Sequence, residues 1–255
     1  MVKPVSYFST AAKPLLLKTF PNKCDSNSSF TIKQLEERDI DEASACLSEA
    51  FSSREMITNH FQIKYSLLYE GIKKDLQRAL DANLCLVCQD KTTEKIAGVI
   101  YYEDLNEVLD PKICQNHTEQ DEDWSKLDEF YQYLYSFISP FAEPKERNDV
   151  LLCKKFAVAK EFESLGVASN LMFAARYIHP RTTKAKRRVM IISSEKSYNF
   201  ALKHGYKLIK KLDFKDSELF QNMDSDSKLG NIYIVKYEPT EGISLIQELK
   251  DLFAE

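Results

Sequence analysis

The segment of residues 156–168 limits the folds open to this chain more than any other. An apolar run at 150–159 passes into a short charged loop, and helical spacing starts at Gly166-Val167-Ala168. The first N–H groups of a helix lack intrahelical partners, and the helix dipole adds partial positive charge there. Small residues leave these groups accessible. The turn is therefore a candidate anion-binding site, although strand–glycine–helix turns also occur without a ligand.

Apolar spacing along the rest of the chain predicts alternating strands and helices. Asp39 and Glu42 form a capping-box pattern before the first helix. Pro180 is expected to end a later helix, and Gly205 to end the next one in a left-handed turn. The predicted fold class is α/β, a mixed sheet with helices on both faces. Strands are predicted at 30–35, 84–88, 96–102, 150–159, 189–192, 206–214 and 231–237, and helices at 40–51, 63–80, 167–178, 195–204 and 243–253.

Composition divides the chain into a main domain and two extensions. Residues 1–29 have the composition of a tail, 30–238 form the domain, and 239–255 form a terminal helix. Residues 103–149 interrupt the domain as an insertion that is acidic in its first half and aromatic in its second. The aromatic half predicts a helix that either packs on the domain or covers an aryl or acyl substrate. Residues 1–29 and 119–141 are the candidate contacts for protein partners.

Charge and cysteine usage exclude several classes of function. Lys and Arg number 35 against 39 Asp and Glu, so the chain lacks the basic field that nucleic-acid binding needs. No apolar run reaches the roughly 18 residues of a membrane span. The six cysteines and four histidines lack metal-ligand spacing, so no metal is expected. Cys85 and Cys88 are predicted to be reduced, buried thiols on opposite faces of one strand. A cytoplasmic location fits best, and the basic, acid-free start of the chain makes a mitochondrial location the alternative.

A second segment carries a family resemblance. Ser193-Ser194-Glu195-Lys196-Ser197 follows the strand at 189–192, and the next helix ends at Gly205-Tyr206. Together with the turn at Gly166, these residues resemble the Gcn5-related N-acetyltransferase (GNAT) superfamily, whose turn reads Arg/Gln-x-x-Gly-x-Gly/Ala. The Ser-Ser-x-x-Ser spacing is most similar to the insect-type arylalkylamine N-acetyltransferases. The resemblance covers about residues 30–237 and implies a GNAT-like, mostly antiparallel sheet whose central strands splay apart.

The resemblance implies an acyltransferase that uses acetyl-CoA as co-substrate and acetylates an amine by direct transfer. Acetyl-CoA would lie between the splayed strands, with its diphosphate on the amides of the glycine turn. The acceptor would be a small amine or a protein amine. The residues implied to bind acetyl-CoA are Phe156, Ala157, Val158, Glu163, Ser164, Leu165, Gly166, Val167 and Ala168.

Three residues are implied to be catalytic. Glu55 would deprotonate the amine, and Ser193 and Ser197 would relay protons or protonate the departing CoA sulfur. The aromatic stretch around Glu55 matches the family loosely, with only the Glu retained, and Ala201 stands where many GNAT enzymes have Tyr. Residue chemistry alone leaves open that Glu55 is a solvated helix-end residue. It equally leaves open that the serines are an N-cap and a surface residue.

Glu163 is the main argument against this activity. It places an anion where the family has Arg or Gln, and Glu161 lies two residues away. Two like charges about 5 Å apart cost about 3 kcal/mol at an effective dielectric near 20, before solvent screening. The alternative function is therefore a catalytically inactive GNAT-fold protein that serves as a structural or interaction subunit of a larger assembly.

Overall fold

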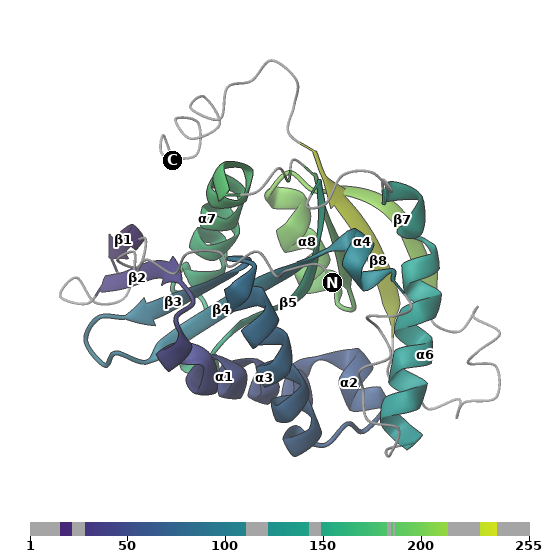
Figure 1. The fold of residues 1–255 in the computed structure, drawn as a ribbon, viewed down its shortest axis with the longest axis horizontal. Coiled ribbons are helices and arrows are strands. Elements are labelled where there is room, and N and C mark those ends of the chain that lie inside the picture. The colour runs from purple at the N-terminus through teal and green to yellow at the C-terminus, as the bar shows by residue number, and fades with distance from the viewer. Residues whose placement is uncertain are drawn as a thin grey trace, which may run out of the picture.

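The computed structural model describes residues 16–21, 29–110, 122–142, 149–182, 185, 187–213 and 230–238. These residues form an eight-stranded sheet in the order β1-β2-β3-β4-β5-β6-β8-β7, with helices on both faces (Figure 1). The α/β fold class is therefore confirmed. The strands are β1 (Leu16–Pro21), β2 (Ser29–Gln34), β3 (Cys85–Asp90), β4 (Ile96–Asp104), β5 (Val150–Val158), β6 (Arg187–Ile192), β7 (Lys207–Asp213) and β8 (Asn231–Tyr237).

The sheet is mostly antiparallel and opens at its centre. Only β5 and β6 run parallel. Their pairing ends at Cys153 and Met190, whereas β4 stays paired with β5 as far as Val158. The second half of β5 therefore has β4 on one side and no ladder to β6 on the other. This geometry confirms the predicted mixed sheet with splayed central strands.

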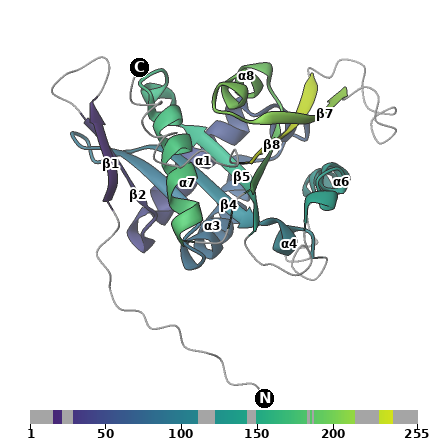
Figure 2. The same cartoon turned by 90° about the horizontal axis from the view of Figure 1, so that it is seen from above.

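Seven helices belong to the described residues. They are α1 (Ile40–Arg54), α2 (Met56–His60), α3 (Tyr65–Asp81), α4 (Leu105–Val108), α6 (Glu122–Ser136), α7 (Val167–Thr182) and α8 (Glu195–Lys203). Figures 1 and 2 show α6 standing beside α4 at one end of the sheet. The short helix α2 was not predicted, because five residues are too few to show helical periodicity.

Alternation along the strands divides the core into two layers. Cys85 and Val87 of β3 pack with α1 and α3, whereas Leu86 and Cys88 pack with α7 on the opposite face. The predicted opposite orientation of Cys85 and Cys88 is confirmed, and both thiols are free and buried. Helix α3 supplies buried residues at helical spacing, and burying a large aliphatic side chain such as Leu76 contributes about 1.5–3 kcal/mol.

The start of α1 differs from the prediction. Asp39 is the N-cap, but its side chain makes no cap hydrogen bond to α1. Its carboxylate instead accepts from the Glu36 backbone N–H and from the buried Lys33 ammonium. Glu42 accepts a hydrogen bond from the Ile96 backbone N–H at 2.9 Å, and so ties α1 to β4. The capping-box pattern was therefore assigned to the wrong pair of residues.

The prediction that Pro180 ends its helix is wrong, because α7 continues to Thr182. A proline removes the N–H that would bond the carbonyl four residues earlier, here that of Arg176. The buried Arg188 guanidinium donates to this carbonyl at 3.4 Å and to the Ala175 carbonyl at 3.3 Å. Gly205, by contrast, ends α8 as predicted, with φ of 79°.

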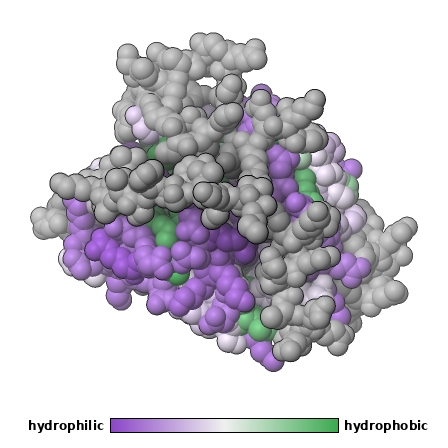
Figure 3. Space-filling model, in the orientation of Figure 1, coloured by the Kyte–Doolittle hydropathy of each residue, from purple (hydrophilic) through white to green (hydrophobic). Residues whose placement is uncertain are grey.

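The ends of the domain are described only in part. Strand β1 lies within residues 1–29, where the sequence predicts only a tail, and it pairs antiparallel with β2. The predicted helix at 243–253 lies outside the described residues. Described residues on the face shown in Figure 3 are mainly hydrophilic, with small apolar patches. No described helix has the length and apolar character needed to cross a bilayer.

Candidate functional site

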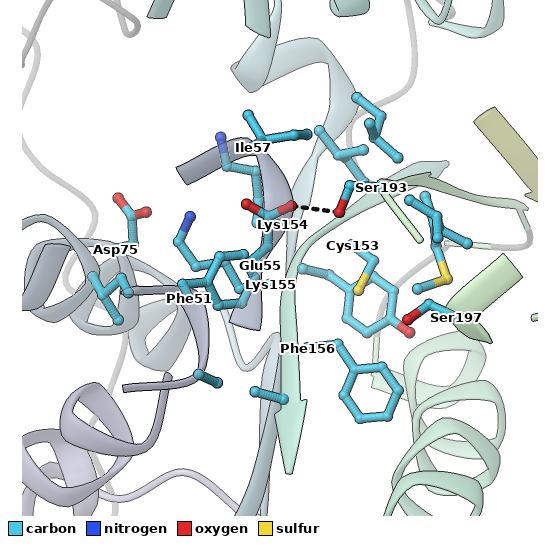
Figure 4. Close-up of a pocket in the computed structure, with 18 of the residues that line it drawn as sticks. Phe51, Glu55, Ile57, Asp75, Cys153, Lys154, Lys155, Phe156, Ser193 and Ser197 are labelled. Atoms are coloured by element: carbon cyan, nitrogen blue, oxygen red, sulfur yellow. Dashed lines mark hydrogen bonds between the residues drawn. The ribbon is translucent and has the colours of Figure 1, made fainter. Parts of the chain in front are cut away.

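A cavity of about 1390 Å³ lies where β5 and β6 part. Its walls come from both halves of the domain: α1, α3 and α6 on one side, and the turn at Gly166 with the start of α8 on the other. Figure 4 shows Phe51, Asp75 and Lys155 on one side of Glu55, with Ser197 and Phe156 on the other. The parted strands thus produce a cleft that both halves line.

The glycine turn has the geometry of an anion-binding site. Gly166 has φ of 87°, and α7 begins directly after it at Val167. Ser164 also has positive φ, 65°, a conformation that glycine adopts more readily than other residues. Gly98 of β4 allows this close packing, because an added Cβ there would lie 2.9 Å from Cγ1 of Val167. The first turn of α7 therefore sits directly against the sheet at the edge of the cavity.

The structure brings most of the predicted acetyl-CoA residues to the cavity. Leu165 is the exception, since it packs against the core on the α7 face. The residues of this set that line the cavity are Phe156, Ala157, Val158, Glu163, Ser164, Gly166, Val167 and Ala168.

Arg54 changes the electrostatics of this turn. Its guanidinium extends from the end of α1, forms an ion pair with the Glu163 carboxylate, and donates to the Val158 carbonyl at 2.9 Å. The anion at position 163 is therefore compensated by a cation that is 109 residues away in sequence. Arg54 carries no local sequence pattern that points to the turn, and sequence reasoning missed it.

Glu55 and Ser193 meet across the cleft. Glu55 is the N-cap of α2, and one of its carboxylate oxygens accepts from the Thr58 N–H at 2.7 Å. Its other oxygen accepts from the Ser193 hydroxyl at 2.5 Å, as the dashed line in Figure 4 marks. Glu55 is thus a helix-end residue, but it is held in the cavity wall rather than solvated. Its assignment as the base remains a prediction.

The serines after β6 have different roles. Ser194, not Ser193, is the N-cap of α8, and it accepts from the Ser197 N–H at 3.2 Å. Its hydroxyl donates to the Ser197 hydroxyl at 2.9 Å. Because capping is done by Ser194, the hydroxyl of Ser193 is free to face Glu55. Ser193 and Ser197 both line the cavity, but they contact different partners.

Helix α6 of the aromatic insertion packs on the domain and also faces the cavity. Phe130 and Leu134 are buried in the core beside α1 and α3. On the neighbouring face of α6, Trp124, Tyr131 and Tyr135 line the cavity. Helical spacing of three and four residues separates these two sets onto adjacent faces. The insertion therefore both packs on the domain and supplies aromatic walls to the cleft.

An ionic network that the sequence did not reveal lies under α6. Arg78 of α3 bonds Asp75 at 2.6 Å and Glu103 at 3.1 Å, and Glu103 lies 3.5 Å from the Lys154 ammonium. Lys154 also donates to the Tyr135 hydroxyl at 2.9 Å. Burial alone would lower the pKa of Lys154, but Tyr135 and Glu103 outweigh burial and raise it well above its usual range. Glu103 is thus an ion-paired residue of the cavity wall.

A bulge places two lysines in this part of the cleft. The pairing of β4 with β5 shifts between Tyr101 and Tyr102, so Lys154 is an extra residue in β5. Lys154 contacts Tyr135, and Lys155 lies over the Phe51 ring at 4.7 Å. We call this part of the cavity the lysine half; it is formed by Phe51, Glu55, Asp75, Arg78, Glu103, Trp124, Tyr131, Tyr135, Lys154 and Lys155.

Among the described residues, no group of three or more His, Cys, Asp or Glu side chains is arranged to hold a metal ion. The Cys46 and Cys153 thiols are buried, and burial raises the pKa of each to about 12. These thiols are therefore protonated at neutral pH and poor metal ligands or nucleophiles.

Structural comparison identifies the fold as that of the GNAT acetyltransferases. Arylalkylamine N-acetyltransferase 2 from Aedes aegypti has a TM-score of 0.66 and 14% identity over 82% of this chain and 98% of that one. The C-terminal condensation domain of Ebony, in complex with β-alanyl-dopamine, has a TM-score of 0.68 and 12% identity over 82% and 99%. The Drosophila melanogaster polyamine N-acetyltransferase, which forms N-acetylagmatine, has a TM-score of 0.64 and 12% identity over 82% and 100%. In sequence comparisons, no family model and no curated protein matches this chain.

Proposed function

We propose that this protein transfers the acetyl group of acetyl-CoA directly to an amine. The single observation that carries the proposal is the Glu55–Ser193 contact of 2.5 Å, which bridges the cleft between the parted strands. A carboxylate and a hydroxyl are the groups that amine deprotonation and thiolate protonation require. Neighbours of this fold act on arylalkylamines and form N-acetylagmatine, which supports an amine acceptor.

Each residue has a role in this proposal. The amides after Gly166 bind the diphosphate, with Arg54 cancelling the charge of Glu163. Backbone N–H groups of β5 beyond Cys153, where the ladder to β6 ends, stabilise the developing oxyanion. Glu55 accepts the proton of the ammonium, the amine nitrogen bonds to the thioester carbon, and the carbon–sulfur bond breaks. The nitrogen then loses its second proton, which reaches the departing CoA thiolate through Ser193 or Ser197, and the proton held by Glu55 passes to solvent.

Acetyl-CoA titration by calorimetry, followed by acetylation of a panel of amines, tests the proposal. We expect binding and turnover in the wild type. Glu55→Gln should lower kcat at least about 100-fold, the lower range for loss of a general base, with little change in acetyl-CoA affinity. Glu49→Gln, which changes an exposed acid of α1, the helix that ends next to Glu55, is the matched control.

The alternative, an inactive GNAT-fold structural subunit, predicts a different result. It rests on the anion at Glu163, which the Arg54 ion pair compensates. Absence of binding heat at millimolar acetyl-CoA would reject the enzyme and leave the structural role. Binding without acetylation of any amine would reject catalysis alone.

A further inference from the structure

The lysine half of the cavity contains two adjacent lysines, Lys154 and Lys155, which differ in their polar partners. Lys154 has Glu103 and Tyr135 within bonding distance. Among the described residues, the Lys155 ammonium has no hydrogen-bond acceptor and no ion-pair partner, and it lies over the face of Phe51. Burial, the largest cause, lowers the pKa of Lys155, while the nearby carboxylates of Asp75, Glu55 and Glu103 act in the opposite direction. A cation in such a position gains free energy from an anionic ligand, since charges removed from water need a partner.

The carboxylates around Lys155 are already occupied. Asp75 accepts from Arg78 through one oxygen and from the Tyr101 hydroxyl, at 2.9 Å, through the other. Glu103 is shared in the same way between Arg78 and Lys154. Glu55 accepts from Ser193 and Thr58. All six carboxylate oxygens therefore have a partner other than Lys155.

We propose that Lys155 binds a carboxylate of the acyl acceptor, so that the preferred acceptor is a small molecule with both an amine and a carboxylate. The inference rests on the proposed function, because it concerns the acceptor of the same transfer. The amine end would face Glu55, and the acidic end would face Lys155. Phe51, Tyr131 and Tyr135 supply ring faces against which an aromatic side chain of the acceptor can pack.

The charge of Lys155 acts against the simplest acceptors. An arylalkylamine without a carboxylate would offer Lys155 at most a ring face, which is a weaker partner for a buried ammonium than a carboxylate. A diamine would add a second positive charge to the same region. A carboxylate accepting a charge-assisted hydrogen bond from Lys155 satisfies both groups at once.

Matched pairs of acceptors test the inference in the wild-type protein without any substitution. Tyramine and tyrosine, tryptamine and tryptophan, and phenethylamine and phenylalanine differ only by the carboxylate. We expect kcat/KM to be at least about tenfold higher for the carboxylated member, as one charge-assisted hydrogen bond permits. Preference for the decarboxylated member in all three pairs would overturn the inference and leave the acetyltransferase function standing. Absence of acetyl-CoA binding, or of turnover with every acceptor, would overturn both.

Variants at position 155 show whether this lysine causes the preference. Lys155→Met keeps the length of the side chain and can still pack on Phe51, so the fold should be retained. It should lower kcat/KM for tyrosine about tenfold and leave tyramine unchanged or improved. Lys155→Arg should retain the preference, and Lys203→Met, on the exposed surface of α8, is the control. Equal losses for tyrosine and tyramine in Lys155→Met would show a structural role and overturn the inference.

Discussion

Removing Arg54 should leave the Glu163 carboxylate without its ion-pair partner in the turn at Gly166. Arg54 and Glu163 form an ion pair, with 34% and 42% of their side chains exposed. A carboxylate about 5 Å from one diphosphate charge costs about 3 kcal/mol at an effective dielectric of 20, and about 0.8 kcal/mol in bulk water. Because both side chains are partly exposed, the lower part of this range applies. A cost of about 1 kcal/mol corresponds to roughly fivefold weaker binding.

Arg54→Met should therefore raise the Kd for acetyl-CoA about fivefold, and the double variant Arg54→Met with Glu163→Gln should recover most of the loss. Calorimetry at low and high salt measures both effects, and high salt should reduce the difference. S-acetylpantetheine lacks the diphosphate and provides the specificity check. Its kcat/KM as acetyl donor should be the same in Arg54→Met as in the wild type. Arg38→Met removes an exposed Arg–Glu pair away from the cavity and serves as the control. Unchanged acetyl-CoA affinity in Arg54→Met, or an equal loss with S-acetylpantetheine, would refute this reasoning.

Three further outcomes follow from the structure. Gly98→Ala would place a Cβ 2.9 Å from Cγ1 of Val167, so we expect the free energy of unfolding in urea to fall by about 1–3 kcal/mol and acetyl-CoA binding to weaken. An unchanged free energy of unfolding together with unchanged acetyl-CoA affinity would contradict the tight packing. Glu163→Arg replaces the anion of the turn by a cation and should tighten acetyl-CoA binding. Beside Arg54 the new cation meets a like charge, so titration should show a smaller gain than in the double variant Arg54→Met with Glu163→Arg. Burial and the neighbouring Arg176 lower the pKa of His204 from 6.5 to about 4. The unfolded state therefore binds the proton more readily, and the free energy of unfolding should fall as pH drops from 6.5 towards 4. His204→Gln should flatten this part of the stability profile, and an unchanged slope would exclude His204 as its source.

Short-range patterns predicted the elements of the site better than its charges. The turn at Gly166, the helix end at Gly205 and the strands beside them each depend on residues close in sequence, and the structure confirms them. The family resemblance also brought Glu55 and Ser193 together as candidates, and they lie in contact although 138 residues apart.

The misassigned features depend on partners that are distant in sequence. Arg54 compensates Glu163 from another helix, and Arg188 satisfies the carbonyl that Pro180 leaves unbonded. A single sequence contains no periodic signal for such pairings. The ion pairs of Glu103 depend on the fold in the same way, because its cations Arg78 and Lys154 reach it only in the folded chain.

The bond between Glu55 and Ser193 has a thermodynamic consequence for how acceptors compete. In the proposed reaction, an arriving amine meets a carboxylate that already accepts hydrogen bonds from Ser193 and Thr58, so its nitrogen must displace the Ser193 hydroxyl. That penalty is identical for every amine and cancels when two of them are compared. Discrimination among acceptors is therefore decided by the remainder of each molecule and the surfaces it reaches.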